Sequence, residues 1–336
     1  MLARILILSS LILIMSGLGL IGYQFRLSKL KIISPVVYQV EVKERALDHY
    51  SIENLKNTRF SPQEIILADQ NLFYFKSDSA SVSGLINLPD NLPPQGIIVL
   101  LRGYVDREIY TTGTGTKRIG EYLSSNGFIT LAPDFLGYGQ SSSPSAFPLA
   151  ERFQTYTTTL QLLASLPNLP SSVKKIYPDF NFDFDPAKIG LFGHSNGGHI
   201  ALAVLEITGQ NYPTVLWAPV SKPFPYSVLY YTDEFEDQGK ALRKIISDFE
   251  RNYQSEKYSI TEYFDLINAP LSIHQGLNDQ EVPYWWSDEL VKILKEKNKN
   301  AVYFTYPGEN HNFNGGSWIT LAAHTRNFYR QNLPIP

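Results

Sequence analysis

A short glycine-rich motif is the first candidate for catalytic chemistry. Residues 193–198 read Gly-His-Ser-Asn-Gly-Gly and contain the pattern Gly-x-Ser-x-Gly around Ser195. The motif follows an apolar run at 189–192 and precedes a stretch typical of a helix. A serine on such a strand-to-helix turn is exposed on a strained backbone, and the glycines beside it, Gly193 and Gly197, let the two segments pass closely. The pattern predicts that Ser195 is a nucleophile, the alternative being a glycine-rich helix start without chemistry.

A serine nucleophile needs two partners. At neutral pH its hydroxyl reacts poorly until a base removes the proton and a carboxylate orients that base. Where this turn occurs, the partners follow the serine in the order Asp, His, each after a later strand. Asp279 follows the apolar run 271–273, and His311 follows the run 302–306. Alone, each is an ordinary loop residue, but together with Ser195 they predict a catalytic triad.

Acyl transfer also needs hydrogen-bond donors for the oxyanion of the tetrahedral intermediate. One predicted donor is the backbone N–H of Asn196, directly after the nucleophile. The second is expected from the loop after the apolar run 97–101. In this loop Gly103 allows a bend, and Tyr104 is the candidate donor through its N–H or its phenol.

The other histidines and glycine-rich segments are predicted to be structural. His194 is the variable residue of the motif, and packing is the expected role of His199, four residues beyond Ser195 on the same helix. No His-Glu-x-x-His pattern or carboxylate cluster indicates a metal, and no cofactor is predicted. Residues 113–117, Gly-Thr-Gly-Thr-Lys, lack the ending of a phosphate-binding loop and are expected to form a loop and a helix start.

Strands and helices alternate around these residues. Short apolar runs are typical of strands buried on both faces, at 97–101, 128–132, 189–192, 215–218, 271–273 and 302–306. Helical stretches lie between them, at 116–125, 152–166, 198–207, 285–297 and 318–329. An antiparallel hairpin is predicted earlier, at 72–76 and 82–88. This order predicts an α/β fold with a mostly parallel twisted sheet and helices on both faces.

Composition and charge exclude several classes of protein. Of 336 residues, 43% are hydrophobic and 18% are charged, which is enough apolar surface for a core and excludes a disordered chain. The 29 Lys and Arg against 32 Asp and Glu leave a net charge of −3 without a basic block, so nucleic acid is not an expected partner. The chain has no cysteine, which excludes disulfides, thiolate metal sites and a cysteine nucleophile.

The N-terminal segment is predicted to lie outside the catalytic fold. Residues 5–21 are apolar apart from Ser and Gly, and as a helix they would rise about 26 Å, close to the ~30 Å of a bilayer core. We predict a signal anchor at 1–29, with a cleaved signal peptide as the alternative. The cations after the run favour a cytoplasmic catalytic domain, whereas Arg4 directly before it is typical of an export signal. We expect a membrane-anchored or exported protein with its catalytic domain on the outer face.

The rest of the chain is predicted to hold one catalytic domain. Residues 30–71 are expected to be a linker or N-terminal extension, and 72–336 the domain itself. About fifty residues, 220–268, separate two predicted strands and are long enough for a small cap over the pocket.

The sequence from about Phe73 onwards resembles the α/β-hydrolase fold, and within it the prolyl-oligopeptidase-like group of dipeptidyl aminopeptidase and acylaminoacyl peptidase relatives. The resemblance is carried by the hairpin residues 82–89, by Pro-Asp-Phe-Leu-Gly-Tyr-Gly-Gln-Ser at 133–141, by the 193–198 motif, by the loop 274–283 and by Tyr-Pro-Gly before His311. It implies Ser195, Asp279 and His311 as the triad. Two departures stand out: Arg102-Gly103 replaces the His-Gly of many α/β-hydrolases. In addition, we expect no counterpart of the large N-terminal propeller of the true oligopeptidases in these residues.

The expected activity is hydrolysis through an acyl-enzyme, without cofactor or metal. The resemblance favours amide bonds of small peptides, with a carboxylesterase or lipase-like activity as the alternative. An alternative from another class is a non-catalytic protein of this fold that binds a partner.

Overall fold

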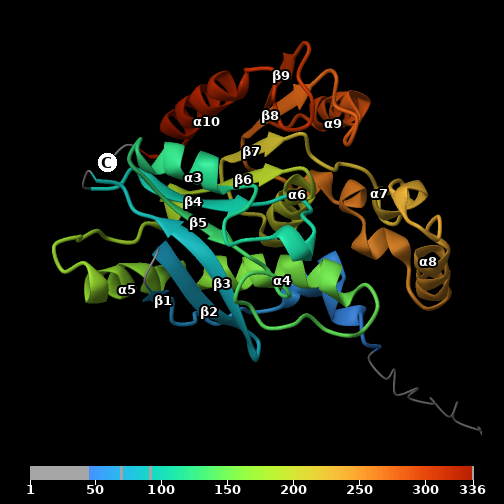
Figure 1. Cartoon of the computed structure of the whole chain (residues 1–336), viewed down its shortest axis with the longest axis horizontal. Helices are drawn as coiled ribbons and strands as arrows, with labels where there is room; N and C mark the ends of the chain where they lie inside the picture. The colour runs from blue at the N-terminus through green and yellow to red at the C-terminus, as the bar shows by residue number, and fades with distance from the viewer. Residues whose placement is uncertain (1–44, 69–70, 91–92, 335–336) are drawn as a thin grey trace, which may run out of the picture. The chain divides into compact units, whose positions relative to one another are not determined.

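The computed structural model describes residues 45–68, 71–90 and 93–334 (Figure 1). These residues belong to one compact unit that begins at Arg45. The predicted signal anchor at 1–29 and the first part of the predicted linker lie outside the described residues. Among the described residues, no helix has the length and apolar character needed to cross a membrane.

A mixed sheet of nine strands lies at the centre of the described chain, in the order β1-β2-β3-β5-β4-β6-β7-β8-β9 (Figure 1). The strands β1, β2 and β3 pair antiparallel, as do β3 and β5, whereas all pairs from β5 to β9 are parallel. The predicted hairpin and mostly parallel sheet are confirmed. The strands are β1 (Ile66–Ala68), β2 (Leu72–Ser77), β3 (Ala80–Asn87), β4 (Gly96–Leu101), β5 (Phe128–Pro133), β6 (Ile189–His194), β7 (Thr214–Trp217), β8 (Leu271–Gly276) and β9 (Ala301–Tyr306).

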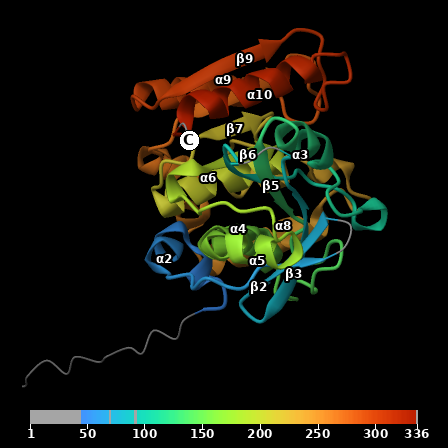
Figure 2. The ribbon, with the colours of Figure 1, turned by 90° about the vertical axis from the view of Figure 1, so that its left-hand side faces the viewer.

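Helices cover both faces of this sheet. On one face lie α3 (Lys117–Ser124) and α10 (Trp318–Asn332), and on the other lie α2 (Ile52–Asn57), α4 (Ala150–Ser165) and α6 (Asn196–Thr208). Figure 2 shows α3 and α6 on opposite sides of the central strands. The remaining helices beside the sheet are α5 (Leu169–Ile176), after α4, and α9 (Tyr284–Glu296), which packs on β8 and β9.

The alternation of side chains along a strand explains why its sequence is wholly apolar. In β4, Ile97, Val99 and Leu101 join the core that contains α4 and α6. Ile98 and Leu100 point to the opposite face and join the core that contains α3 and α10. Because both faces are covered, every position of this strand is buried, as the apolar run predicted.

Residues 302–306 form the predicted strand, but the prediction that it is buried on both faces is wrong. They form β9, the edge strand, and Val302 is 45% exposed. An edge strand has one neighbour and incomplete cover, which the residue types of this run do not reveal. The short edge strand β1 and the helix α5 are among the described elements that the sequence analysis did not predict.

The described part of the predicted linker or N-terminal extension contributes to the core. A 3-10 helix at Asp48–Tyr50 leads into α2, and Leu47, Ile52 and Leu55 are buried in the same core as α4 and α6. The hydroxyl of Tyr258 also donates to the carbonyl of Leu47 at 3.0 Å. The compact unit therefore begins well before residue 72.

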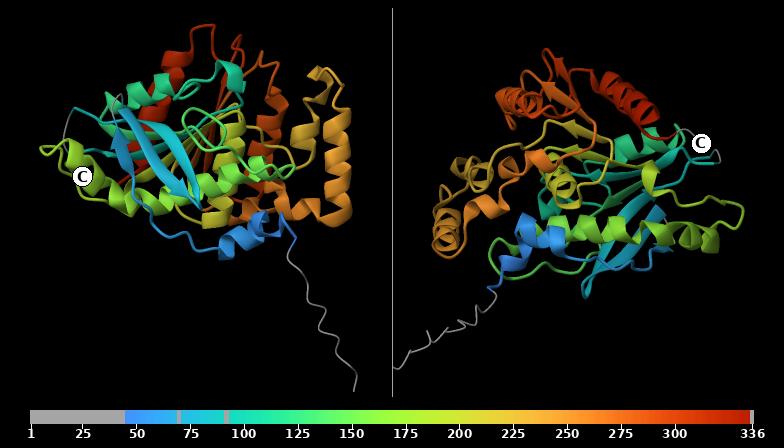
Figure 3. Two further views of the ribbon diagram at one scale, coloured as in Figure 1. Left: turned by 60° about the horizontal axis from the view of Figure 1, so that its bottom comes forward. Right: turned by 180° about the vertical axis from the view of Figure 1, so that it is seen from behind.

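The segment 220–268, predicted to form a cap, is a helical insertion between β7 and β8. It contains α7 (Tyr226–Leu229), α8 (Lys240–Asn252) and several 3-10 helices. Figure 3 shows α8, in yellow-orange, at the margin of the molecule in both views. Before α8, the carboxylate of Asp237 accepts the N–H groups of Gly239 and Ala241, each at 2.8 Å, and so holds the turn that leads into the helix.

Candidate active site

Ser195 lies between β6 and α6 in a backbone conformation that few residues adopt. Its φ and ψ are 57° and −121°; such a conformation costs on the order of 1–3 kcal/mol in a residue other than glycine. The N–H of Ser195 donates to the carbonyl of Trp217 at 2.9 Å, and its carbonyl accepts from the N–H of Val220 at 3.1 Å. These bonds to the end of β7 hold the turn in the geometry expected of a strand-to-helix elbow.

The glycines of the motif are required by close backbone contacts. A Cβ on Gly193 would clash with the carbonyl oxygen of Gly197, and a Cβ on Gly197 would clash with that of Leu101. Any larger residue would push α6 away from β4 and β6. The structure therefore accounts for glycine at both predicted positions.

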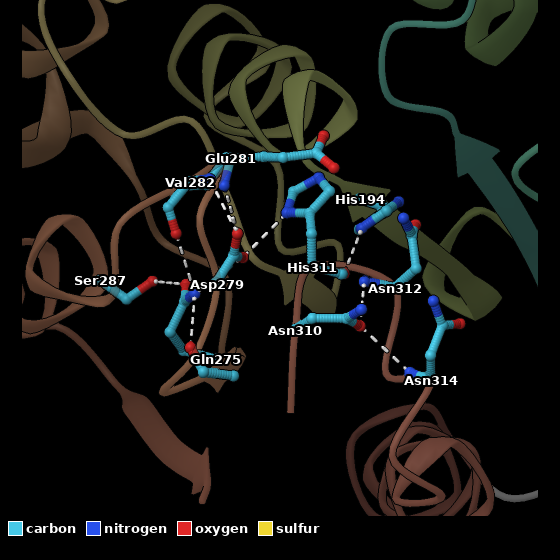
Figure 4. Close-up of polar contacts among 11 residues, drawn as sticks. His194, Gln275, Asp279, Glu281, Val282, Ser287, Asn310, His311, Asn312 and Asn314 are labelled. Atoms are coloured by element: carbon cyan, nitrogen blue, oxygen red, sulfur yellow. Dashed lines mark hydrogen bonds and ion pairs between the residues drawn. The ribbon is translucent and has the colours of Figure 1, made fainter. Parts of the chain in front are cut away.

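Asp279 and His311 are hydrogen-bonded to each other (Figure 4). Nδ1 of His311 lies 2.8 Å from Oδ2 of Asp279, and both side chains are buried. Oδ1 of Asp279 accepts the N–H groups of Glu281 and Val282 at 3.0 and 2.8 Å. Because an ionised carboxylate only accepts, the proton of a neutral His311 sits on Nδ1, and Nε2 is left to take a proton. The fold thus brings together the acid and the base predicted from the sequence.

Gln275 fixes the orientation of the acid. Its Nε2 donates to Oδ2 of Asp279 at 3.0 Å, and its Oε1 accepts the hydroxyl of Ser287 at 2.8 Å. The side chain is fully buried at the end of β8 (Figure 4). Sequence reasoning missed this residue, although it lies only four positions before Asp279.

Glu309 holds the loop that carries His311. Its carboxylate, 2% exposed, accepts the N–H groups of Gly315 and Ser317 at 2.8 and 2.6 Å. Burial alone would raise the pKa of Glu309, but the hydrogen bonds from Ser317 and Gly315 outweigh it, and the pKa is lowered. The carbonyl of Glu309 accepts the N–H of Asn278 at 2.9 Å. The loops of the acid and the base are therefore tied to each other.

His194, at the end of β6, supports the base. Its Nε2 lies 3.2 Å from the carbonyl oxygen of His311, and the two ring centroids are 4.6 Å apart. The ring also stacks on Trp217 at 3.9 Å. Burial, and secondarily the nearby His311, lower the pKa of His194 well below its ordinary value. A neutral ring whose Nε2–H donates to the His311 carbonyl fits this position.

Gly103 brings the loop after β4 against the nucleophile. A Cβ on Gly103 would lie 2.9 Å from Cβ of Ser195. The side chain of Tyr104 is 75% exposed, and its hydroxyl donates to Oδ1 of Asp106 at 2.9 Å. The phenol is therefore engaged with Asp106, and the backbone N–H of Tyr104 is left as the candidate oxyanion donor of this loop. Asn196 offers the other, because the N–H of a first helical residue has no acceptor within its helix.

A buried arginine precedes Gly103. Nη1 of Arg102 donates to the carbonyl of Gly103 at 2.8 Å, and Nη2 donates to the carbonyl of Asp134 at 3.0 Å. The guanidinium lies 3.9 Å from the ring centroid of Tyr138 and 4.7 Å from that of Tyr110. From the sequence, Arg102 was noted only as a departure from the family pattern. In the fold it clamps the loop that reaches Ser195.

The carboxylate of Asp134 anchors the same loop, which follows β4, by accepting hydrogen bonds from its side chains. Its Oδ1 accepts the hydroxyl of Tyr110 at 2.6 Å, and its Oδ2 accepts those of Thr112 and Ser83 at 2.8 and 2.6 Å. The carboxylate is fully buried. Burial, with the charge of Asp134 next, raises the pKa of Tyr110, so its hydroxyl stays a donor. The anchored loop thus depends on a residue of the 133–141 motif.

His199 takes no part in the site. Its Nδ1 lies 3.0 Å from the carbonyl oxygen of Val220, and its Nε2 lies 2.9 Å from the hydroxyl of Tyr156. Burial lowers the pKa of His199 well below its ordinary value. With both ring nitrogens engaged, it fits the packing role expected for it.

A serine on a strained elbow, followed by an acid and a base at the carboxyl ends of two later parallel strands, defines the α/β-hydrolase class. Within that class, residues 179–334 match the model of the prolyl oligopeptidase family.

Comparison with known proteins supports the same assignment. Dipeptidyl aminopeptidase BIII of Pseudoxanthomonas mexicana is 29% identical over 134 residues, which are 38% of this chain and 19% of that protein. The chain spans about a fifth of the length of the curated relatives it matches.

Solved structures share the fold. A puromycin-hydrolyzing peptidase of Mycobacterium tuberculosis superposes with a TM-score of 0.54 at 19% identity, over 76% of this chain and 38% of that chain. Est1E from Butyrivibrio proteoclasticus, solved with ferulic acid bound, superposes with a TM-score of 0.50 at 17% identity, over 77% of this chain and 98% of that chain. The α/β-hydrolase fold predicted from the sequence is confirmed.

Proposed function

We propose that the protein is a serine peptidase that cleaves small peptides through an acyl-enzyme. The observation that carries this proposal is the 2.8 Å hydrogen bond between His311 Nδ1 and Asp279 Oδ2 in a chain whose Ser195 lies on a strained elbow. A carboxylate that fixes the imidazole and leaves Nε2 unprotonated is what activation of a serine hydroxyl requires.

The reaction follows from these roles. Nε2 of His311 removes the proton as Oγ of Ser195 attacks the acyl carbon, and Asp279 stabilises the imidazolium that forms. The N–H groups of Asn196 and Tyr104 donate to the oxyanion, each contributing about 3–4 kcal/mol to transition-state stabilisation. His311 then protonates the leaving amine, and a water activated by the same imidazole hydrolyses the acyl-enzyme.

The preference for amide bonds is supported by similarity. The chain resembles a dipeptidyl aminopeptidase in sequence and a puromycin-hydrolyzing peptidase in fold. Because the chain covers only part of these proteins, the preference is a proposal about bond type and small substrate size alone.

A carboxylesterase is the second candidate. It is favoured by the esterase PF2001 of Pyrococcus furiosus, because the chain covers 97% of that protein's structure at a TM-score of 0.51 and thus shares nearly its whole architecture. The same triad chemistry hydrolyses esters, with an alcohol in place of the amine as leaving group.

Labelling by a fluorophosphonate probe tests the catalytic proposal. We expect one equivalent of label on the folded wild type and none on Ser195→Ala. Equal labelling of both proteins would exclude Ser195 as the nucleophile. No labelling of the folded wild type would favour a non-catalytic protein of this fold.

Substrate preference is tested separately. The kcat/KM for aminoacyl or blocked-peptide amides is compared with that for acyl esters of similar size. Measurable amide turnover supports the peptidase, whereas ester turnover without detectable amide turnover assigns the protein as an esterase.

A further inference from the structure

A cavity of about 340 Å³ lies beside the loop of His311. Its walls are the loop 111–115, the first turn of α3, Trp318 at the start of α10, and the side chains of Trp217 and Asn312. Asn312 directly follows the proposed base in the chain. Trp217 stacks on His194, whose ring in turn is 4.6 Å from that of His311. The cavity therefore lies beside the loop that carries the proposed catalytic histidine.

The charged side chains that line this cavity are cationic. They are Lys117 and Arg118, and none of the described lining residues is acidic. The ion pair of Lys117 with Glu121 is exposed and 4.0 Å long, and is therefore weak. The guanidinium of Arg118 lies 3.6 Å from the ring centroid of Trp318, and the described residues give it no ion pair. The positive charge of the wall is thus largely uncompensated.

Hydroxyl groups lie beside these cations. Thr111 and Thr114 line the same wall. A carboxylate is attracted by cations and accepts hydrogen bonds from hydroxyl groups, so the two kinds of group together suit a carboxylate.

The direction of proton transfer identifies the part of the substrate that would lie here. His311 takes the proton of Ser195 and delivers it to the leaving group, so the leaving group must lie on the side of His311. A cavity that adjoins the loop of His311 is placed to hold that group.

We infer that this cavity binds an anionic group of the leaving portion of the substrate, namely the carboxylate of a peptide cleaved near its free C-terminus. The inference rests on the proposed serine-hydrolase function and adds a substrate class to it.

Paired peptides test the inference. The two members share one sequence and differ only in a C-terminal carboxylate or carboxamide, and the measured quantity is the ratio of their kcat/KM values. We expect the wild type to favour the free acid by about tenfold or more, as for a charge-assisted contact. In the double variant Lys117→Gln, Arg118→Gln the ratio should fall to near one.

A matched control removes a cation elsewhere. Lys174→Gln, on α5 and beside a separate depression of the surface, should keep the wild-type ratio. An equal ratio in the wild type and the double variant would overturn the inference.

Failure of the proposed function gives a different result. If neither peptide is cleaved but acyl esters are, the peptidase assignment is wrong. The cavity is then tested with two esters whose leaving alcohol carries a carboxylate or its carboxamide. A ratio near one for the wild type on this pair would overturn the inference, and a ratio that depends on Lys117 and Arg118 would support it.

Discussion

Arg102 donates to the carbonyl oxygen of Gly103 at 2.8 Å, and this bond orients the peptide unit that offers an oxyanion donor. The carbonyl of Gly103 and the N–H of Tyr104 belong to one planar trans peptide, so they point in opposite directions. A guanidinium on the carbonyl therefore fixes the direction of the N–H and polarises it. Arg102 thus positions a proposed oxyanion donor without touching substrate.

Replacement of Arg102 should lower kcat more than it raises KM. We expect Arg102→Met to reduce kcat by about 10–100-fold, somewhat less than the removal of a whole oxyanion donor, with KM changed less than threefold. A trifluoromethyl ketone that forms the tetrahedral adduct should lose affinity by a similar factor. Steady-state kinetics and inhibition constants on the same preparations check both effects.

The conservative variant separates positioning from folding. Arg102→Lys keeps the charge and should recover part of kcat, while Arg330→Lys, on the exposed side of α10, should leave both values at wild-type levels. A fall in Tm of Arg102→Met with unchanged kcat and unchanged inhibitor affinity would show that the arginine is merely structural.

The hydrogen bond between Asp279 and His311 predicts a large catalytic loss with little loss of stability. In Asp279→Asn the amide can donate towards Nδ1, which favours the wrong tautomer of His311, so kcat should fall by about 10³–10⁴-fold. Fluorophosphonate labelling should slow in parallel. Asp265→Asn, which removes an exposed carboxylate paired with Lys297, should label at the wild-type rate. Wild-type turnover by Asp279→Asn would exclude this residue as the acid.

Replacing a glycine of the elbow should destabilise the protein because the added Cβ has no room, and not because of the backbone conformation of the glycine. Gly197→Ala places a Cβ against the carbonyl oxygen of Leu101, and we expect a loss of more than about 3 kcal/mol in the free energy of unfolding. Gly308→Ala is a matched control: its φ is 80°, but no atom lies within 4 Å of the added Cβ. It should lose only about 1–2 kcal/mol. Urea denaturation compares the two, and equal losses would contradict the steric argument.

The fold could be predicted where local patterns carry the information. A strand covered on both faces, such as β4, is apolar at every position. The strained elbow requires glycines on both sides of the serine, and these glycines form the motif from which Ser195 was predicted as the nucleophile. Asp279 and His311 could be found because each follows its strand directly. For β9 the same reasoning failed, since residue types do not tell whether a second neighbouring strand exists.

The contacts that tune the site could not be predicted, because they join residues far apart in the sequence. Arg102 meets the carbonyl of Asp134 across 32 positions, and Ser83 meets its carboxylate across 51. No local spacing reveals such pairs. Glu309 lies only two positions before His311. Its role could not be predicted, because it depends on the chain after His311 turning back so that the N–H groups of Gly315 and Ser317 reach the Glu309 carboxylate.

Glu309 should make stability depend on pH in the acid range. The pKa of this carboxyl is lowered in the folded protein from its ordinary value of 4.5, so its contribution is complete above pH 4.5 and is lost as pH falls through the folded-state pKa. We expect Glu309→Gln to lower the free energy of unfolding by about 1–3 kcal/mol at pH 7, since an amide fits two N–H donors poorly. Urea denaturation at a series of pH values should show a constant difference from the wild type down to about pH 4.5 and a narrowing one below it. Glu296→Gln, an exposed carboxylate at the end of α9, should show no such difference. A gap between wild type and Glu309→Gln that stays unchanged from pH 7 to the acid limit would mean that the ionised carboxylate does not hold the loop of His311.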